Sequence, residues 1–285
     1  MSAVKVSIFA AGFCSCPEHI AIQGGRWRNI HFPAMFALLE HPRFGAILFD
    51  TGYSYRFFDV TRRFPERLYA LLTPVTLREQ QLAVNQLAAR GFKPSDISHV
   101  IISHFHADHV AALADFPRAR YVYLPSAFDA VRELRGLAAL SRAYLPGLIP
   151  ADFAERAAPI AASVSRLLPP EYAPFTRGFD LLGDESLLAV ELPGHAAGQI
   201  GLFARDESGA AYFFAADAAW LGRSIRENRP PHRLADLLFP DPPAYRSTLA
   251  DLHAFQSARP AVRVIPSHCE ATLAEYVPWL ALEQK

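Results

Sequence analysis

The sequence predicts an α/β layered fold whose chemistry lies on a loop after a buried strand. Three apolar runs in the first half, residues 4–9, 46–49 and 99–102, are rich in β-branched and aromatic residues and are bounded by Gly, Pro, Asp or Ser, as strands are. An amphipathic helical pattern lies between the last two runs, and a cluster of His and Asp follows the third. The order strand, helix, strand and polar cluster is typical of an α/β fold with a functional loop.

The first strand is predicted from the apolar stretch of residues 4–13. With Lys5 near its start, this stretch also resembles a signal sequence, but it lacks a clear small-residue cleavage site. The helix between the second and third strands is predicted by a capping box at residues 76–79, by one apolar helical face over residues 83–88, and by Gly91 as a stop.

Residues 125–175 differ in amino-acid composition and spacing from the rest of the chain. Ala, Leu and Arg recur there at helical spacing and prolines interrupt them, which predicts an insertion of short, proline-bounded helices. A length of 285 residues suits one large domain or two small ones. We expect one domain over residues 1–285 that contains this insertion.

Strand patterns resume in the second half, at residues 186–192, 199–204 and 211–216. A turn-forming Asp-Glu-Ser-Gly segment joins the last two, so these strands are expected to form a meander. A final strand is predicted at residues 262–265, directly before Pro-Ser-His.

A metal-binding motif is predicted directly after the strand at residues 99–102, where the chain reads Ser-His-Phe-His-Ala-Asp-His. Imidazole nitrogen and carboxylate oxygen are the usual protein ligands of a cation such as Zn²⁺. Side chains alternate in an extended segment, so His104 and His106 point the same way and both can bind one ion. Asp108 and His109 come after the chain turns and are placed to serve a second ion.

Further candidate ligands follow later strands. His195 stands in a Pro-Gly-His segment after one strand, Asp217 ends another, and His268 follows the last. With eleven histidines in 285 residues, the central motif would arise by chance on the order of once in a thousand such chains. The recurrence of such residues at strand ends therefore favours a metal site over a solvated histidine-rich loop.

Together with Phe-Asp-Thr-Gly at residues 49–52, these motifs resemble those of the metallo-β-lactamase superfamily, in the branch that carries a full dinuclear site. The resemblance implies a four-layer αββα sandwich of two mixed β-sheets flanked by helices. It implies two divalent metal ions, Zn²⁺ in the first place, with Fe, Mn or Co as alternatives. It assigns His104, His106 and His195 to the first ion, Asp108, His109 and His268 to the second, and Asp217 as a bridge.

The same resemblance bears on the activity. True β-lactamases of this superfamily usually lack the equivalent of His109, so antibiotic hydrolysis is not favoured. The arrangement is similar to that of N-acyl homoserine lactonases and related small-molecule esterases or organophosphate hydrolases. Those lactonases often carry a tyrosine three residues beyond the bridging aspartate, where this chain has Trp220, and this leaves homoserine-lactone specificity open. Asp50 is expected to orient a metal-bound imidazole rather than to bind metal.

The predicted chemistry is hydrolysis of a small-molecule ester or lactone. Two neighbouring cations lower the pKa of a shared water and polarise the substrate carbonyl. Asp108 or Asp217 then relays the proton to the leaving group, and the sequence does not distinguish them. The apolar residues of the insertion either pack as helices or form a cap that selects acyl or aromatic substrates. They are Phe128, Leu137, Leu140, Tyr144, Leu145, Leu148 and Phe153.

The amino-acid composition argues against nucleic acid and membranes as binding partners. Lys plus Arg equals Asp plus Glu at 28 each, so no global field favours nucleic acid or an anionic membrane surface. No apolar run approaches the roughly 18 residues of a membrane span. The three cysteines are expected to be reduced thiols of a cytoplasmic protein. We expect a small-molecule substrate and allow for a homodimer.

Several alternative functions would use the same metal-binding residues. A phosphoesterase acting on nucleic acid would need a basic surface. A thioesterase of the glyoxalase II type normally adds a C-terminal helical domain, whereas seventeen residues follow His268 here. A redox di-iron protein usually has an acidic ligand in place of His106 or His109. A non-catalytic metal-binding effector is the alternative from another class.

The remaining histidines are expected to be surface or packing residues, although an N-terminal loop could bring the first two to the site mouth. They are His19, His31, His41, His99, His232 and His253.

Overall fold

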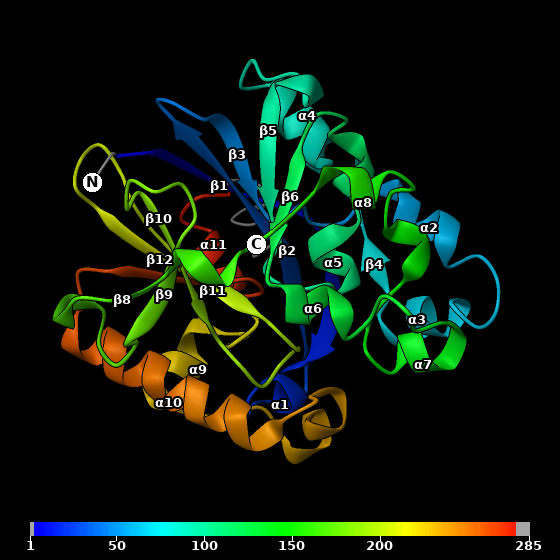
Figure 1. Ribbon diagram of the computed structural model, residues 1–285. Coiled ribbons are helices and arrows are strands. Elements are labelled where there is room, and N and C mark those ends of the chain that lie inside the picture. Colours follow the sequence, from blue (N-terminus) through cyan, green and yellow to red (C-terminus); the bar gives the residue numbers. More distant parts are fainter. Residues whose placement is uncertain (1–2, 278–285) are drawn as a thin grey trace.

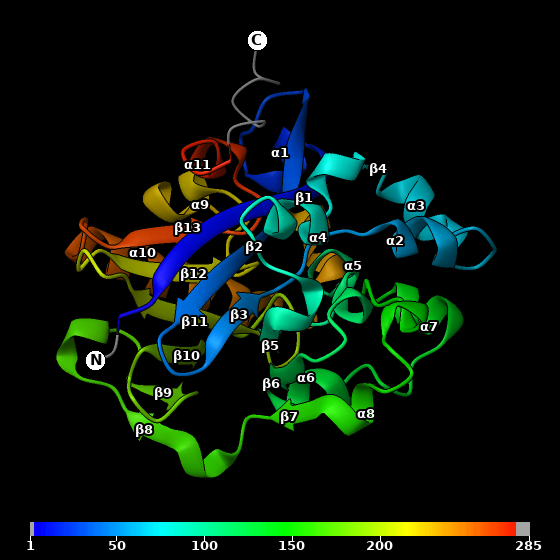
Figure 2. The same cartoon turned by 90° about the horizontal axis from the view of Figure 1, so that it is seen from above.

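Two mixed β-sheets pack face to face, with helices on their outer sides, in the computed structural model, which describes residues 3–277 (Figures 1 and 2). Within that range the first sheet has seven strands in the order β4-β1-β2-β3-β5-β6-β7. They are β1 (Lys5–Pro17), β2 (Asn29–His41), β3 (Gly45–Phe49), β4 (Val75–Thr76), β5 (Ile97–Ile101), β6 (Arg120–Tyr123) and β7 (Ala157–Pro159).

The second sheet has six strands within the described residues, in the order β13-β12-β11-β10-β9-β8. They are β8 (Ser165–Leu167), β9 (Arg177–Asp180), β10 (Leu187–Glu191), β11 (Ile200–Arg205), β12 (Ala211–Ala216) and β13 (Arg263–Pro266). Strands β10, β11 and β12 are antiparallel neighbours, which confirms the predicted meander.

Helices form the two outer layers. One outer core cluster joins the first sheet to α2 (Tyr55–Val60), α4 (Ala83–Ala88), α5 (Ala107–Val110), α6 (Pro125–Asp129), α7 (Gly136–Leu140) and α8 (Phe153–Arg156), with α3 (Arg67–Leu72) packed nearby. The other joins the second sheet to α9 (Gly222–Glu227) and α10 (Pro242–Ala258). The helices α1 (Glu18–Ala21) and α11 (Glu270–Leu273) contact β1. The αββα fold predicted from the resemblance is confirmed.

Strand β3 shows why a continuous apolar run suits this architecture. Side chains alternate between the faces of a sheet, and both faces are covered here. Ile47 and Phe49 belong to the core between the sheets, whereas Ala46 and Leu48 belong to the outer core beneath the helices. The ring of Phe49 lies 5.5 Å from that of Phe214, which joins the two sheets.

Parallel strand pairing places the loops that carry the candidate ligands together at the carboxyl ends of neighbouring strands. Strands β3, β5 and β6 run parallel, so the segments after β3 and β5 leave the first sheet side by side. Strands β12 and β13 are also parallel, with Phe214 opposite Ile265, so Asp217 and His268 leave the second sheet as neighbours.

Two local predictions differ from the structure. The capping box at residues 76–79 is wrong, because Thr76 belongs to β4 and pairs with Phe13 of β1. Helix α4 begins later, at Ala83, after a 3₁₀ turn in which the Arg78 amide donates to the side chain of Gln81. Gly91 does follow this helix, with φ +87°.

Residues 125–175 are only partly helical. They contain α6, α7 and α8, but also β7, which pairs with β6 in the first sheet, and β8, which belongs to the second. The segment therefore carries the chain from one sheet to the other as well as covering the first. Among the described residues, no helix is both long enough and apolar enough to cross a bilayer.

Candidate metal centre

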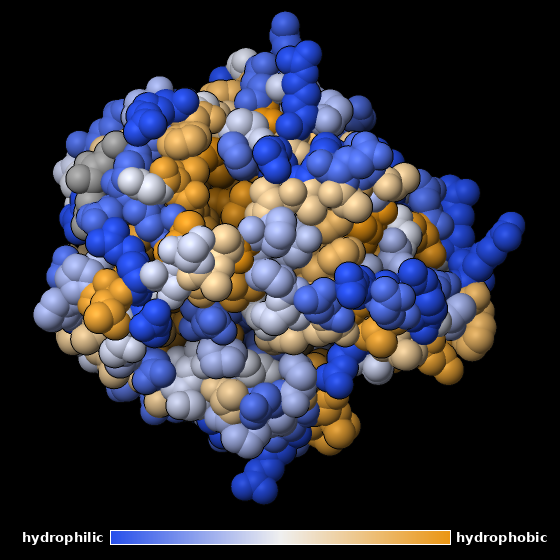
Figure 3. Space-filling model, viewed as in Figure 1, coloured by the Kyte–Doolittle hydropathy of each residue, from blue (hydrophilic) through white to orange (hydrophobic). Residues whose placement is uncertain are grey.

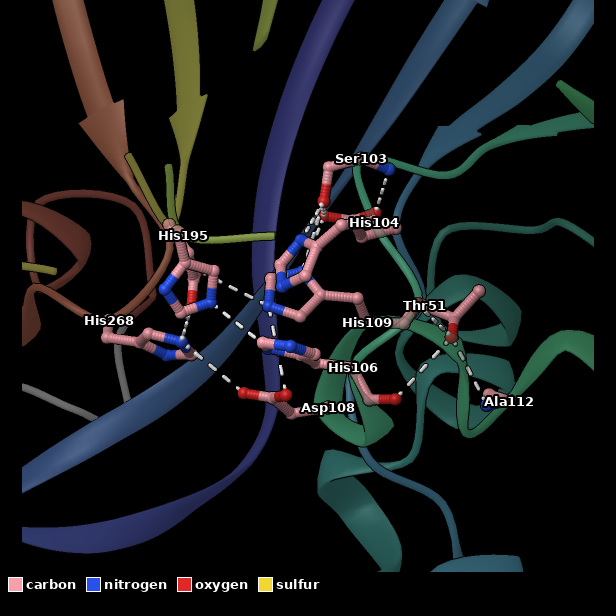
Figure 4. A network of polar contacts seen from close by, with 12 residues as sticks. Thr51, Ser103, His104, His106, Asp108, His109, Ala112, His195 and His268 are labelled. Atoms are coloured by element: carbon pink, nitrogen blue, oxygen red, sulfur yellow. Dashed lines mark hydrogen bonds and ion pairs between the residues drawn. The ribbon is translucent and has the colours of Figure 1, made fainter. Parts of the chain in front are cut away.

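The segment after β5 delivers four polar side chains to the space between the two sheet edges (Figure 4). The chain leaves the strand extended through His106, which has φ −72° and ψ 156°, and then turns into α5. His104 and His106 therefore precede the turn, while Asp108 and His109 lie on the helix, as the sequence predicts. All but the half-buried His106 are buried.

One group of possible ligands consists of His104, His106, His195 and Asp217, whose donor atoms all lie within 4.8 Å of one another. His195 Nε2 lies 3.0 Å from His106 Nδ1 and 3.2 Å from Asp217 Oδ2. Three imidazoles and one carboxylate suit a cation with the ligand preferences of Zn²⁺.

The second group consists of Asp108, His109 and His268, within the same distance limit. His268 Nε2 lies 3.3 Å from Asp108 Oδ2, and His109 Nε2 lies 3.8 Å from Asp108 Oδ1. Asp217 reaches this group too, with Oδ2 at 3.0 Å from His268 Nε2 and Oδ1 at 3.3 Å from His109 Nε2. The structure thus brings together all seven residues that the sequence singled out, with Asp217 between the groups.

Buried atoms without hydrogen-bond partners test whether a cation fits. Among the described residues, His104 Nε2 is buried and makes no hydrogen bond, and the buried His109 Nε2 and Asp217 Oδ1 lie 3.3 Å apart without forming one. Buried polar atoms are normally satisfied, since leaving one unpaired costs about 1–3 kcal/mol. A divalent cation coordinated by these atoms would satisfy them, so the residues present fit the metals that the resemblance implies.

Electrostatics favour the same conclusion. Burial lowers the pKa of His106 to about 4 and holds the pKa of His104 and His195 well below its usual range. These imidazoles are therefore neutral at neutral pH, as metal ligands must be. Burial also opposes charge on His109, but three neighbouring carboxylates, that of Asp108 first, outweigh it and raise the His109 pKa well above its ordinary value. The site attracts positive charge.

Hydrogen bonds behind the ligands set their orientation. Asp50 Oδ2 lies 2.8 Å from His109 Nδ1, and Asp50 also accepts hydrogen bonds from the amide and hydroxyl of Ser103. His268 Nδ1 lies 2.8 Å from the carbonyl oxygen of Pro33. A carbonyl can only accept, so Nδ1 carries the proton and Nε2 offers its lone pair to the site. Sequence reasoning anticipated the role of Asp50 but not that of Pro33, because a backbone carbonyl leaves no signature in side-chain identity.

Trp220 lies beside the first group. It is 6% exposed, and its ring packs edge-on against that of His195 at 5.9 Å. Phe32 and Phe239 contact the indole from other sides, and Phe32 also stacks on His268 at 5.1 Å. Trp220 thus forms an apolar wall against the candidate ligands.

A cavity of about 140 Å³ opens beside His106 and His195. Its other lining residues are Phe105, Ala127, Ala130, Val131, Arg142, Ala196, Ala197, Leu238 and Pro240. A larger hollow of about 490 Å³ lies between β5, β6 and Leu181–Leu182, and none of the seven candidate ligands lines it. Figure 3 shows an apolar hollow on the face seen in Figure 1, with hydrophilic residues spread around it.

None of the seven apolar residues of the insertion, for which the sequence left helix packing and a substrate cap as alternatives, lines the smaller cavity. Tyr144, Leu145, Leu148 and Phe153 are buried in the core over the first sheet, and Phe128 and Leu140 pack against it. Leu137 is 60% exposed. Those side chains are core or surface residues because the short helices turn their apolar faces toward the sheet, while Ala127, Val131 and Arg142 face the cavity.

The six remaining histidines lie outside both ligand groups. His41 Nε2 lies 2.9 Å from Asp184, His253 Nδ1 lies 2.9 Å from the Ile225 carbonyl, and His19 stacks on Trp27, which is 88% exposed.

Seven clustered candidate metal ligands, at the ends of the strands of an αββα sandwich, are typical of a metallo-hydrolase. The chain belongs to the metallo-beta-lactamase superfamily, whose profile matches residues 38–268.

The individual proteins that this chain resembles share only 14–26% of its sequence over the aligned residues. The N-acyl homoserine lactonase AttM of Rhizobium radiobacter is 26% identical over 232 residues, covering 77% of this chain and 78% of the relative, and the AttM of Azorhizobium caulinodans is 26% identical over 230 residues with the same coverage. A solved N-acyl homoserine lactone hydrolase with N-hexanoyl-L-homoserine at its catalytic metal centre has a TM-score of 0.72 at 17% identity, covering 96% of this chain and 97% of that one. The dizinc quorum-quenching lactonase AidC has a TM-score of 0.63 at 14% identity, covering 98% and 92%.

Proposed function

We propose that this protein is a two-metal hydrolase that opens the ester bond of a small-molecule lactone, with N-acyl homoserine lactones as the first substrates to test. The observation that carries the proposal is the pair of ligand groups that share Asp217. The AttM relatives and the product-bound hydrolase support the choice of lactones.

In this proposal His104, His106 and His195 would hold one ion and Asp108, His109 and His268 would hold the other, with the Asp217 carboxylate within reach of both groups. Zn²⁺ is the proposed ion, since imidazole and carboxylate suit it and the structural neighbour AidC is a dizinc enzyme. When bound, the two ions lower the pKa of a water molecule and polarise an ester carbonyl. The three free cysteines support a reducing compartment such as the cytoplasm.

Asp108 is the better candidate for moving the proton to the leaving group. Its side chain is 11% exposed, whereas that of Asp217 is 4% exposed and lies against imidazoles on both sides. Those imidazoles, that of His268 first, outweigh burial and hold the pKa of Asp217 well below its usual range. A carboxylate so stabilised remains charged and serves as a ligand.

The test is a rate comparison on purified protein with lactones, aryl esters, thioesters and phosphotriesters. The proposal expects the highest kcat/KM for a lactone and loss of that activity in His106→Ala. Preference for phosphotriesters would instead favour an organophosphate hydrolase. Hydrolysis of none of the four by a metal-loaded protein would favour a metal-binding effector.

A further inference from the structure

Among the residues that the structure describes, Arg142 is the one charged residue, apart from the candidate ligands, that lines the cavity beside His106 and His195. It follows α7, and its backbone amide donates to the Ala139 carbonyl at 3.0 Å. The next residue, Ala143, accepts a hydrogen bond at 3.3 Å from the amide of Ala107, the first residue of α5. Backbone contacts therefore hold Arg142 beside the ligand motif without help from its own side chain.

The guanidinium of Arg142 has no hydrogen-bond or ion-pair partner within residues 3–277. Nearby arginines differ, since Arg135 donates to two backbone carbonyls and Arg156 pairs with Asp152 at 2.8 Å. Arginine carries five N–H donors and no acceptor. The guanidinium N–H groups of Arg142 are therefore free to donate hydrogen bonds to a molecule in the cavity.

The rest of the cavity wall is mostly apolar. Ala127, Ala130, Val131 and Leu238 offer no side-chain donors or acceptors there. An oxygen acceptor that enters beside such a wall is partly removed from water, which strengthens its hydrogen bond to a guanidinium. Arg142 remains exposed to solvent, so its contribution is that of a partly screened contact.

We propose that Arg142 is a specificity residue that binds an oxygen acceptor, an amide carbonyl or a carboxylate, on the part of the substrate away from the scissile ester. This inference rests on the proposed lactone hydrolysis. Its consequence is that the protein distinguishes lactones that carry such an acceptor from lactones of the same size that do not.

The experiment measures kcat and KM for three lactones of equal ring size, which carry an N-acyl amide, a carboxylate, or only an alkyl chain. Arg142→Ala is expected to raise KM and to lower kcat/KM about three- to fivefold for the first two, since the contact is partly screened by solvent. The alkyl lactone should change by less than about twofold. Arg142→Lys should recover part of the loss for the carboxylate, because the charge remains, and less for the amide. Arg118→Ala is the matched control, since Arg118 is exposed and lies outside the cavity.

The outcomes separate the two proposals. If wild type hydrolyses the lactones and Arg142→Ala slows all three equally, or none of them, the specificity role is overturned while lactone hydrolysis stands. If wild type hydrolyses none, the proposed function fails and this inference falls with it. A larger effect on the carboxylate than on the amide identifies an anionic substrate, and the reverse identifies an N-acyl substrate.

Discussion

Asp50 Oδ2 lies 2.8 Å from Nδ1 of His109, and neither side chain has more than 1% of its surface exposed. Asp50 directly follows β3 and has φ +58°, and Ser103, after the neighbouring β5, donates to it twice. Parallel strands thus carry a carboxylate to a position directly behind a candidate ligand. The contact fixes which nitrogen of His109 faces the site.

Replacing Asp50 is expected to weaken metal binding without removing a ligand. Asp50→Asn should lower the affinity of the second ion about tenfold to a hundredfold, because the His109 ring loses its anionic partner. Competition with a chromophoric chelator measures this. Asp115→Asn is the control, since Asp115 pairs with Arg56 at the surface. Equal affinities in wild type and Asp50→Asn would show that the contact does not orient a ligand.

Each of the two groups of candidate ligands is expected to hold its own metal ion, so a change in one group should remove one ion. His106→Ala and His268→Ala should each reduce the metal content of the purified protein from about two ions to about one per chain. Elemental analysis gives the number. His232→Ala, a change at an exposed histidine outside both groups, should leave it unaltered. Unchanged content in either ligand variant would remove that residue from the site.

Metal removal is expected to destabilise the fold. Each ion present at a thousandfold excess over its Kd contributes roughly 4 kcal/mol to the free energy of unfolding, on the order of 10 °C in Tm. Thermal unfolding with and without a chelator measures the difference, and readdition of Zn²⁺ should restore the Tm. An identical Tm under both conditions would contradict a site built to hold cations.

Gly194 precedes a candidate ligand in a conformation that other residues rarely adopt. Its φ is +122°, and an added Cβ would lie 2.1 Å from the backbone nitrogen of Tyr245 in α10. Gly194→Ala should lower the free energy of unfolding by about 3 kcal/mol and displace His195. Gly209→Ala is the control, because its φ is +84° but nothing lies within 4 Å, so only the strain of about 1 kcal/mol applies. Urea denaturation compares them, and equal losses would show that the α10 contact is unimportant.

Cys16 should resist alkylation in the native protein. Burial raises the pKa of its thiol from about 9 to about 12, so the thiol stays protonated at pH 8. The unfolded chain loses this proton first, so stability from this group is complete below pH 9 and declines as the pH rises from there toward 12. Iodoacetamide labelling followed by mass spectrometry tests this, and rapid native labelling of Cys16 at pH 8 would contradict it.

The clustering of the seven candidate ligands could be predicted from the sequence, because each stands shortly after a recognisable strand pattern. His104 and His106 depend only on strand alternation, and each remaining ligand follows an apolar run of recognisable type. Strands β3 and β12 were expected at residues 46–49 and 211–216 and lie there.

The elements that sequence reasoning missed depend on tertiary context. Strand β2 has polar Asn29 and His31 near its start and contains Pro33, yet it is the long partner of β1. Helix α10 opens with two prolines, which resemble a loop, but Asp241 caps it and a proline suits the first helical turn. Thr76 had the pattern of a cap and became a strand residue through pairing with Phe13. The sequence left open whether the apolar side chains of the insertion pack as helices or form a cap, since periodicity gives a helix an apolar face without saying what it faces. Phe153 packs in the core.

The most direct measurement titrates metal-free protein with Zn²⁺ while hydrolysis of N-hexanoyl homoserine lactone is followed. The account predicts no hydrolysis before metal is added and a rate that rises to a plateau near two equivalents. Full activity in the metal-free protein, or no hydrolysis at any metal loading, would contradict it.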